Sequence, residues 1–207
     1  MKYEWKKKAK DLYLPKEHPE IITVPSMKFF TLHGQGNPNG DKFAEEVGVL
    51  YSLSYAVKML PKKDITPPGY FEYTVFPLEG VWDLADEAKE LDSLDKDKLI
   101  YTIMIRQPDF VTNDIALTAI EETKKKKHHQ LYDKVKFESI EEGMCIQMMH
   151  VGSFDSEPES FAKMEEYCRT NNLKRLSLTH REIYITDARK TSQEKQKTVL
   201  RFKVGKV

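Results

Sequence analysis

Apolar and polar positions alternate in residues 180–187, close to the C-terminus, as they do in a half-buried β-strand. Glu182 and Tyr184 share one face of this expected strand, whereas Ile183 and Ile185 share the other. We expect the two isoleucines to face a core that is covered by a helix. The carboxylate and the phenol then lie on the opposite face, which is either solvated or part of a pocket.

The same order of elements is expected twice along the chain. Two apolar, strand-like runs each reach a histidine, His33 or His150, and then a loop that contains glycine. Each run is followed by the pattern of a helix and then by the patterns of two strands. The runs are residues 27–34 and 144–152, the helices are expected at 43 to about 60 and 161 to about 169, and the later strands at 70–76, 99–106, 179–186 and 198–204. The repeated unit is therefore β-α-β-β.

Further elements connect the two units. The segment Pro108-Asp109-Phe110 opens a helix over about 112–126, and a strand is expected near 134–139 before a turn at 140–143. At the start of the second unit's helix, Ser156 and Glu159 have the spacing of a capping box, with Pro158 in the first turn.

The repeat predicts an α+β protein made of two β-α-β-β modules that pack about a pseudo-two-fold axis. A groove between two such modules is a common position for a ligand. We expect an N-terminal extension, residues 1–20, and one domain, residues 21–207, whose repeats span about 21–107 and 108–207.

Composition narrows the class of protein. Hydrophobic residues make up 40% of the 207 residues and charged residues 32%, which is typical of a globular protein and not of a disordered one. The formal net charge is zero, so no overall field attracts nucleic acid or an anionic membrane. Cys145 and Cys168 cannot form a disulfide framework and are expected to be core thiols of a reducing compartment. No run approaches the length of a membrane span, and we expect a cytoplasmic protein.

Two conspicuous motifs have ordinary structural explanations. The segment from Gly34 to Gly40 lies between a strand and a helix but lacks the G-x-G-x-x-G spacing of a dinucleotide loop, so we interpret its glycines as turn residues. The run 124–127 is four lysines, which favour the negative end of a helix dipole. His128 and His129 are adjacent and lack the i, i+4 spacing of two metal ligands on one helix face. We therefore expect no nucleic acid and no metal at this run.

Covalent catalysis has no support in the sequence. There is no Gly-x-Ser-x-Gly elbow, and neither cysteine has a histidine at a diagnostic spacing. The matching positions of His33 and His150 at strand ends favour hydrogen-bonded structural roles over a catalytic pair.

Aromatic residues are dense around the expected carboxylate. Tyr51 and Tyr55 lie one turn apart on the first helix and share a face. Any single aromatic residue is explained by core packing, but the group as a whole exceeds what two small helix-on-sheet layers need. The other members are Tyr70, Phe71, Tyr73, Trp82 and Tyr101, with Met104 on the strand of Tyr101. A carboxylate among aromatic rings suits flat, lipophilic and often cationic molecules.

Several segments resemble the GyrI-like small-molecule-binding domains. The most specific is HREIYITDARK at residues 180–190, followed by KTVLRF at 197–202. Other matching segments are PLEGVW at 77–82, MIRQPDF at 104–110 and HVGSFD at 150–155. The resemblance covers the chain from about residue 21 onward. It implies a duplicated β-α-β-β fold of the SHS2-like type and a central groove for hydrophobic, planar and cationic compounds, and it places the family's pocket glutamate at Glu182.

Many members of this family are effector domains attached to a DNA-binding module, for which the first twenty residues are too short. Some stand-alone relatives with this Trp and Glu arrangement resemble hydrolases that open the strained ring of cyclopropane-bearing DNA alkylators with water. We therefore expect a detoxifying hydrolase with Glu182 as general base and Tyr55 or Tyr184 as hydrogen-bond donor to the substrate. The expected ligand contacts are Trp82, Tyr51, Phe71, Tyr73, Tyr101, Met104 and His150.

Two alternatives stay open. In one, the protein binds or sequesters hydrophobic cationic drugs without turnover, and Glu182 pairs with the positive charge of the ligand. In the other, it is an interaction module for a partner protein such as a topoisomerase, which the mixed surface charge does not favour. In each case we expect no cofactor and no metal. We also expect no direct binding of nucleic acid and no association with a membrane.

Overall fold

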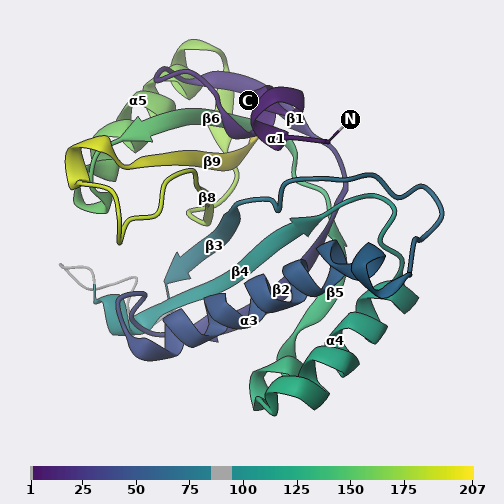
Figure 1. The fold of residues 1–207 in the computed structure, drawn as a ribbon. Helices are drawn as coiled ribbons and strands as arrows, with labels where there is room; N and C mark the ends of the chain where they lie inside the picture. Colours follow the sequence, from purple (N-terminus) through teal and green to yellow (C-terminus); the bar gives the residue numbers. More distant parts are fainter. Residues whose placement is uncertain (1, 85–94) are drawn as a thin grey trace. The chain divides into compact units, whose positions relative to one another are not determined.

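The structure, a computed structural model, describes residues 2–84 and 95–207 (Figure 1). The chain is divided into two compact units, and each is described by itself. The first unit contains the described residues of Met27–Leu78 and Trp82–Ile140, together with the N-terminus up to Tyr3. The second contains Glu4–Ser26, Glu79–Val81 and Glu141–Val207. The groove and the two-fold axis expected between two halves stay predictions.

The first unit is an antiparallel sheet that carries two helices. Strand β2 lies between β4 and β5, and β3 lies on the other side of β4 (Figure 1). Helix α3 packs on β2 and β4, and α4 packs beside α3. The elements are β2 (Met27–Gln35), α3 (Asp41–Lys58), β3 (Leu78–Leu84), β4 (Leu99–Gln107), α4 (Asn113–Lys127) and β5 (Lys136–Ile140), with short 3-10 turns η1 (Leu60–Lys63), η3 (Lys96–Lys98) and η4 (Gln130–Lys134).

Apolar spacing explains why α3 packs on this sheet. Val49, Leu50, Leu53 and Val57 recur at helical intervals and are buried. The helix α4 begins after Thr112, whose side chain accepts a hydrogen bond from the backbone N–H of Ile115. Both helices and β5 were predicted close to these positions, and the lysine run does form the last turn of α4.

The second unit is an antiparallel sheet with the strand order β1-β6-β9-β8, and β7 also pairs with β9. Helix α5 packs on β6 and β7 and covers a core that includes Met148, Met164, Leu200 and Phe202. The elements are α1 (Trp5–Lys8), α2 (Lys10–Tyr13), β1 (Glu20–Val24), β6 (Gly143–Val151), α5 (Glu157–Thr170), β7 (Leu173–Arg175), β8 (His180–Tyr184) and β9 (Lys197–Lys206), with 3-10 turns η5 (Phe154–Ser156) and η6 (Gln193–Lys195).

The fold is α+β. The element order is β2-α3-β3-β4 in the first half of the chain and β6-α5-β7-β8-β9 in the second, where the short strand β7 stands between the helix and β8, and the duplication of one unit stays a prediction. In each half the last strand lies between two others, because β4 is flanked by β3 and β2, and β9 is flanked by β8 and β6. None of the helices in the described part of the chain is both long enough and apolar enough to cross a membrane.

The strand predicted at residues 70–76 is wrong. This segment makes only a single parallel bridge, between Tyr73 and Tyr3, and the second strand of the unit is β3, which begins at Leu78. Thr74 donates its backbone N–H to the carbonyl of Tyr3 at 2.9 Å, and Tyr3 donates to Glu72 at 2.6 Å. The aromatic residues suggested a strand, but they pack in an aromatic cluster and the backbone between them pairs with the N-terminus instead.

The start signal predicted at Ser156 is confirmed in its position but not in its hydrogen bond. Ser156 is the N-cap of α5, which begins at Glu157 with Pro158 in its first turn, but the side chain of Ser156 makes no capping hydrogen bond. Its hydroxyl donates instead to the carbonyl of Ser153 at 2.8 Å. The 3-10 turn that precedes α5 supplies this closer acceptor, so the hydroxyl is used inside the loop.

Residues 4–20, most of the expected extension, pack into the second unit. Trp5 and Tyr13 are buried, with ring centroids 5.3 Å apart. Arg201 donates to the carbonyl of Leu12 at 2.7 Å, and Gln147 donates to that of Asp11 at 2.6 Å. These contacts fix the segment against β6 and β9, and β1 then pairs with the free edge of β6.

Candidate functional site

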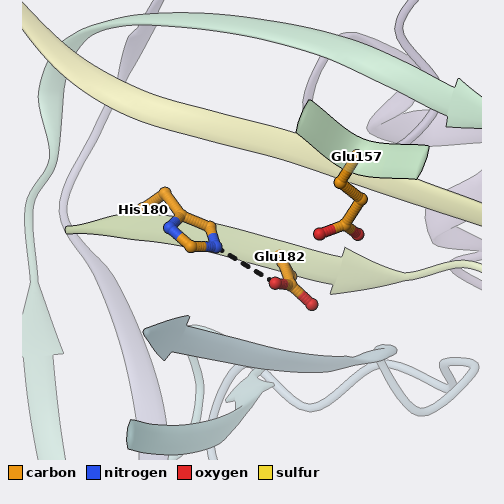
Figure 2. A group of neighbouring side chains, drawn as sticks. All are labelled: Glu157, His180 and Glu182. Carbon is orange, nitrogen blue, oxygen red and sulfur yellow. Dashed lines mark hydrogen bonds and ion pairs between the residues drawn. The ribbon is translucent and has the colours of Figure 1, made fainter. Parts of the chain in front are cut away.

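Three ionisable side chains converge in the second unit. Glu157 comes from the first turn of α5, and His180 and Glu182 come from β8 (Figure 2). Each offers one ligand atom, and the three atoms all lie within 4.8 Å of one another. We call these residues the Glu–His–Glu cluster.

The alternation of β8 places two members of the cluster. His180 and Glu182 are two residues apart, so their side chains emerge on the same face of the strand (Figure 2). Arg181 and Ile183 occupy the other face and are buried. The pairing of Glu182 with Leu200 and of Ile183 with Val199 on β9 fixes this register, since a slip by one residue would exchange the faces.

His150 fixes the start of α5, which carries the third member. Its Nδ1 lies 2.9 Å from the hydroxyl of Ser160, and its Nε2 lies 3.0 Å from the carbonyl oxygen of Ser153. The chain passes between them through Gly152, whose φ of 144° lies in the left-handed half of backbone space. The first turn of α5 is therefore held to β6 from two directions, and Glu157 is held with it.

The two carboxyl groups differ in their partners. Glu182 is 8% exposed, and its Oε1 lies 3.1 Å from Nε2 of His180. Glu157 is 7% exposed, and its Oε1 has no hydrogen-bond partner within the described part of the chain. Burial, followed by the negative charges of Glu182 and Asp155, raises the pKa of Glu157 far above its usual range, to about 10.

A second charged network lies on the opposite face of β8. Arg181 contacts Glu79 at 2.6 Å and Glu142 at 3.1 Å, and Arg201 contacts the other oxygen of Glu142 at 3.0 Å. The hydroxyl of Tyr13 donates to Glu79 at 3.4 Å. Because the guanidinium of Arg181 is committed to that face, it does not neutralise the Glu–His–Glu cluster.

Two further residues predicted for the site, Tyr184 and His150, lie in the second unit on elements that carry or contact the Glu–His–Glu cluster. Tyr184 follows Glu182 on the same face of β8, is partly buried, and makes an edge contact with Phe154 at 6.1 Å. Both ring nitrogens of His150 face loop and helix groups, which supports the structural role and leaves ligand contact by this residue a prediction. His33, in the first unit, is exposed, and its Nδ1 lies 3.2 Å from the hydroxyl of Thr102.

Trp82 and Tyr101 belong to one aromatic cluster of the first unit. Their ring centroids are 5.2 Å apart, and Phe43 contacts both. The hydroxyl of Tyr101 donates to Glu46 at 2.7 Å, so its polar end is satisfied inside the unit. Met104, three residues farther along β4, is 1% exposed.

Phe71 and Tyr73 belong to a different cluster, which is built around Phe110. Phe71 and Phe110 meet edge to face at 5.4 Å, and Tyr3 contacts Phe71 at 5.6 Å. Tyr73 is 1% exposed, whereas Phe71 is only partly buried. Phe71 and Tyr73 therefore share contacts with Phe110, whereas Trp82 and Tyr101 share contacts with Phe43, and a common cage around a ligand stays a prediction.

Tyr51 and Tyr55 lie on α3 as expected, one turn apart. Tyr51 is partly buried and Tyr55 is 48% exposed, with Nζ of Lys58 5.7 Å from its ring centroid. The buried stripe of α3 runs through Leu50, Leu53 and Val57, so Tyr55 projects away from it. The role of Tyr55 as a donor to a substrate stays a prediction.

The sequence argument missed Glu157 and His180 as site residues. The signal for His180 was present, because it precedes Glu182 by two residues on the same strand face. Glu157 gave a weaker signal. Carboxylates are common in the first turn of a helix because they stabilise the helix dipole, so such a residue does not by itself indicate a site. Only the packing of α5 beside β8 shows that it points at Glu182.

Hollows among the described residues include one in each unit. One, of about 560 Å³, lies between the end of α4 and η4 and is lined by charged and polar side chains that include Lys124, His129 and Asp133. The other, of about 120 Å³, lies beside His150 and Ser160 and is much smaller than a site for a drug-sized molecule. Neither is lined by Glu182.

Comparison with known proteins identifies the family of this chain and similar solved structures. The GyrI-like small molecule binding domain family matches residues 17–204. A hydrolase from Listeria innocua is 37% identical over 98% of this chain and 100% of its own, with a TM-score of 0.89. A further hydrolase structure from the same organism is 38% identical over 99% and 100% of the two chains, with a TM-score of 0.91.

A more distant structure is alike in fold alone. The C-terminal domain of EcmrR is 13% identical over 92% of this chain and 98% of its own, with a TM-score of 0.56. No curated protein matches this sequence.

Proposed function

Since the chain belongs to the GyrI-like small-molecule-binding domain family, we propose that it hydrolyses planar, cyclopropane-bearing genotoxic compounds, with Glu182 as the general base. The observation that carries this proposal is the buried carboxylate of Glu182, whose Oε1 lies 3.1 Å from Nε2 of His180. Similarity to two hydrolases at 37% and 38% identity supports turnover as well as binding.

In the proposed reaction, Glu182 accepts a proton from water, and the water oxygen attacks the strained methylene carbon. The cyclopropane C–C bond breaks, and its electron pair passes through the conjugated ring to the carbonyl oxygen, which becomes a phenolate. This oxygen takes a proton, so the product is the substrate plus one water. General base catalysis of this kind contributes about 10²–10⁴-fold in rate.

Burial helps Glu182 in this role. A carboxylate that is screened from bulk water interacts more strongly with a nearby proton donor, because the local dielectric is low. His180 fixes the orientation of one carboxylate oxygen, and the other oxygen is left to address a water molecule. Tyr184, on the same strand face, is the proposed donor to the developing phenolate in this unit.

The other residues named from the sequence keep their expected roles as proposals. Tyr55 is a second candidate donor. Trp82, Tyr51, Phe71 and Met104 are proposed to stack against the planar ring system of the ligand. Of these, Phe71, Tyr51 and Tyr55 have side chains that are partly or well exposed in their own unit.

The test is turnover by mass spectrometry. A spirocyclopropane alkylator in excess is incubated with wild-type protein, with Glu182→Gln and with Glu159→Gln, all in the presence of EDTA. Glu159 is an exposed carboxylate on the same unit and serves as the matched control. We expect many equivalents of ring-opened water adduct from wild type and Glu159→Gln, and about 10²–10⁴-fold less from Glu182→Gln.

Stoichiometric binding with no adduct above the protein-free control would sink the hydrolase proposal. The second candidate, a non-catalytic binder of hydrophobic cations, is favoured by the same buried carboxylate. In that case Glu182→Gln weakens the binding of a planar cation and spares that of a neutral analogue of the same shape.

A further inference from the structure

The Glu–His–Glu cluster has the donor set of a transition-metal site, and we propose that Glu157, His180 and Glu182 bind a divalent zinc or manganese ion. Two carboxylate oxygens and one imidazole nitrogen are directed at a common point in the second unit (Figure 2). Two carboxylates and one histidine, with further positions open to water, form a ligand set that suits these ions.

An independent observation at Glu157 supports its role as a ligand to a cation. The side chain is more than nine-tenths buried and is directed into the cluster, yet its Oε1 has no hydrogen-bond partner among the described residues (Figure 2). A buried polar group without a partner is unfavourable, and a buried charge without one is more so. A bound cation would satisfy both this oxygen and the facing carboxylate.

The protein supplies no other cation to the cluster within its described part. Glu182 is paired with His180, and the ion pairs of the second unit give Glu157 no partner. The nearest arginine in sequence, Arg181, is held on the opposite face of β8 by Glu79 and Glu142. Glu157 and Glu182 therefore lie close together, and the imidazole of His180 is the one basic group beside them in the described part of the chain.

The geometry requires little movement. First-row ions bind carboxylate oxygen and imidazole nitrogen at about 2.0–2.2 Å, which places adjacent ligand atoms up to about 4 Å apart. The three atoms already lie within 4.8 Å, so side-chain rotation of under about 1 Å brings them to bonding distance. The His180–Glu182 contact at 3.1 Å would be replaced by two bonds to the ion.

The scaffold of the cluster is rigid, which favours metal binding. Glu182 lies inside the paired register of β8 with β9, and His180 is the first residue of the same strand. The third ligand is in a helical turn that His150 ties to β6. The imidazole nitrogen favours zinc over magnesium and calcium, which prefer oxygen ligands, whereas the two carboxylate oxygens are ligands that also suit manganese.

This inference goes beyond the proposed hydrolase function and does not depend on it. Metal binding is measured without any cyclopropane compound, and turnover is measured in EDTA. Failure of one proposal is therefore visible without failure of the other.

The experiment is isothermal titration of chelator-stripped full-length protein with Zn²⁺, and with Mn²⁺ followed by electron paramagnetic resonance. We expect a single equivalent of bound ion. Loss of an outer-shell partner typically weakens metal affinity about 10–100-fold, so Glu157→Gln, His180→Ala and Glu182→Gln, which each remove a ligand, should weaken it by at least about 100-fold. Glu159→Gln and His129→Ala, which change exposed or surface groups, should leave the affinity unchanged.

A measurement on the unaltered protein guards against variants that fail to fold. Zn²⁺ should shift the backbone amide resonances around Glu157 and of residues 180–182, and leave those at the end of α4 in place. The proposal is overturned if no ion binds at micromolar concentrations, if binding survives both carboxylate substitutions, or if the shifted resonances belong to His128 and His129.

Discussion

Glu157 and Glu182 are the same residue type, yet each has a distinct environment. Glu182 has an imidazole partner at 3.1 Å, whereas Glu157 has an oxygen without a partner and a strongly raised pKa. Burial raises the pKa of Glu157, the negative charges of Glu182 and Asp155 add to this, and no hydrogen bond to its Oε1 compensates the lost hydration. The two roles proposed for this cluster, base and metal ligand, both follow from this pair of neighbouring carboxyl groups.

At Gly34, the lack of a side chain is required by a close contact with the ring of Tyr101. It pairs with Tyr101 across β2 and β4, and a methyl group added at Gly34 would lie 2.3 Å from Cε2 of that ring. The ring lies there because its hydroxyl donates to Glu46. The space above Gly34 is therefore occupied by a side chain that is itself fixed at its far end.

We expect Gly34→Ala to destabilise the protein by about 1–3 kcal/mol, since the inserted carbon forces the Tyr101 ring off its site. The measurement is the free energy of unfolding from urea denaturation. Gly48→Ala is the matched control, because Gly48 lies in the interior of α3 with nothing within 4 Å of the added carbon. That change should stabilise the protein by about 0.5–1 kcal/mol. A Gly34→Ala protein as stable as wild type would contradict the close approach of the ring.

At the scale of elements, β8 separates two kinds of polar chemistry. Its one face carries His180 and Glu182, and its other face carries Arg181, which is enclosed by two carboxylates. The network continues through Glu142 to Arg201 of β9, which is 1% exposed. Buried ion pairs of this kind cost desolvation, but removal of one partner leaves an uncompensated charge.

Glu142→Gln is expected to lower the free energy of unfolding by about 3–5 kcal/mol, because it leaves Arg181 and Arg201 short of a negative charge in a buried place. Thermal or chemical denaturation measures the loss. The neighbouring Glu141 is exposed, so Glu141→Gln should change stability by no more than about 0.5 kcal/mol. Equal stabilities for the two variants would show that the network contributes little.

At the scale of the whole molecule, the N-terminal segment is part of the second unit's core. Trp5 and Tyr13 are 5% and 1% exposed, and side chains from β6 and β9 donate to the backbone at Asp11 and Leu12. These residues precede the family match, which spans residues 17–204.

Removal of residues 1–14 should therefore lower the melting temperature and make the second unit more sensitive to proteolysis. Loss of one large buried aromatic side chain costs about 3–5 kcal/mol, and the truncation removes two. Circular dichroism melts and limited proteolysis with mapping of the cleavage sites are the measurements. Trp5→Ala should reproduce much of the effect. A truncated protein that melts with wild type would show that the segment is dispensable.

Local patterns of the sequence were sufficient for the α+β class, for most helices and strands, and for the face of β8 that carries Glu182. Alternation and helical spacing act over a few residues, and the register of β8 then follows from the burial of Ile183. The family resemblance from segments such as HREIYITDARK is confirmed by the match over residues 17–204. The sequence misplaced the strand at 70–76, because the packing of its aromatic side chains depends on residues far away in the chain, such as Tyr3 and Phe110.

Only the tertiary structure decided what surrounds the key carboxylate. Glu157 lies 25 positions before Glu182 in the printed sequence, and nothing local indicates that the first turn of α5 is directed at β8. The contacts of Tyr101 with Trp82, of Phe71 with Phe110 and of Trp5 with Tyr13 were likewise decided by the tertiary structure. Such contacts depend on how helices pack on sheets, which side-chain periodicity alone does not specify, whereas the faces of each strand follow from the geometry of the backbone.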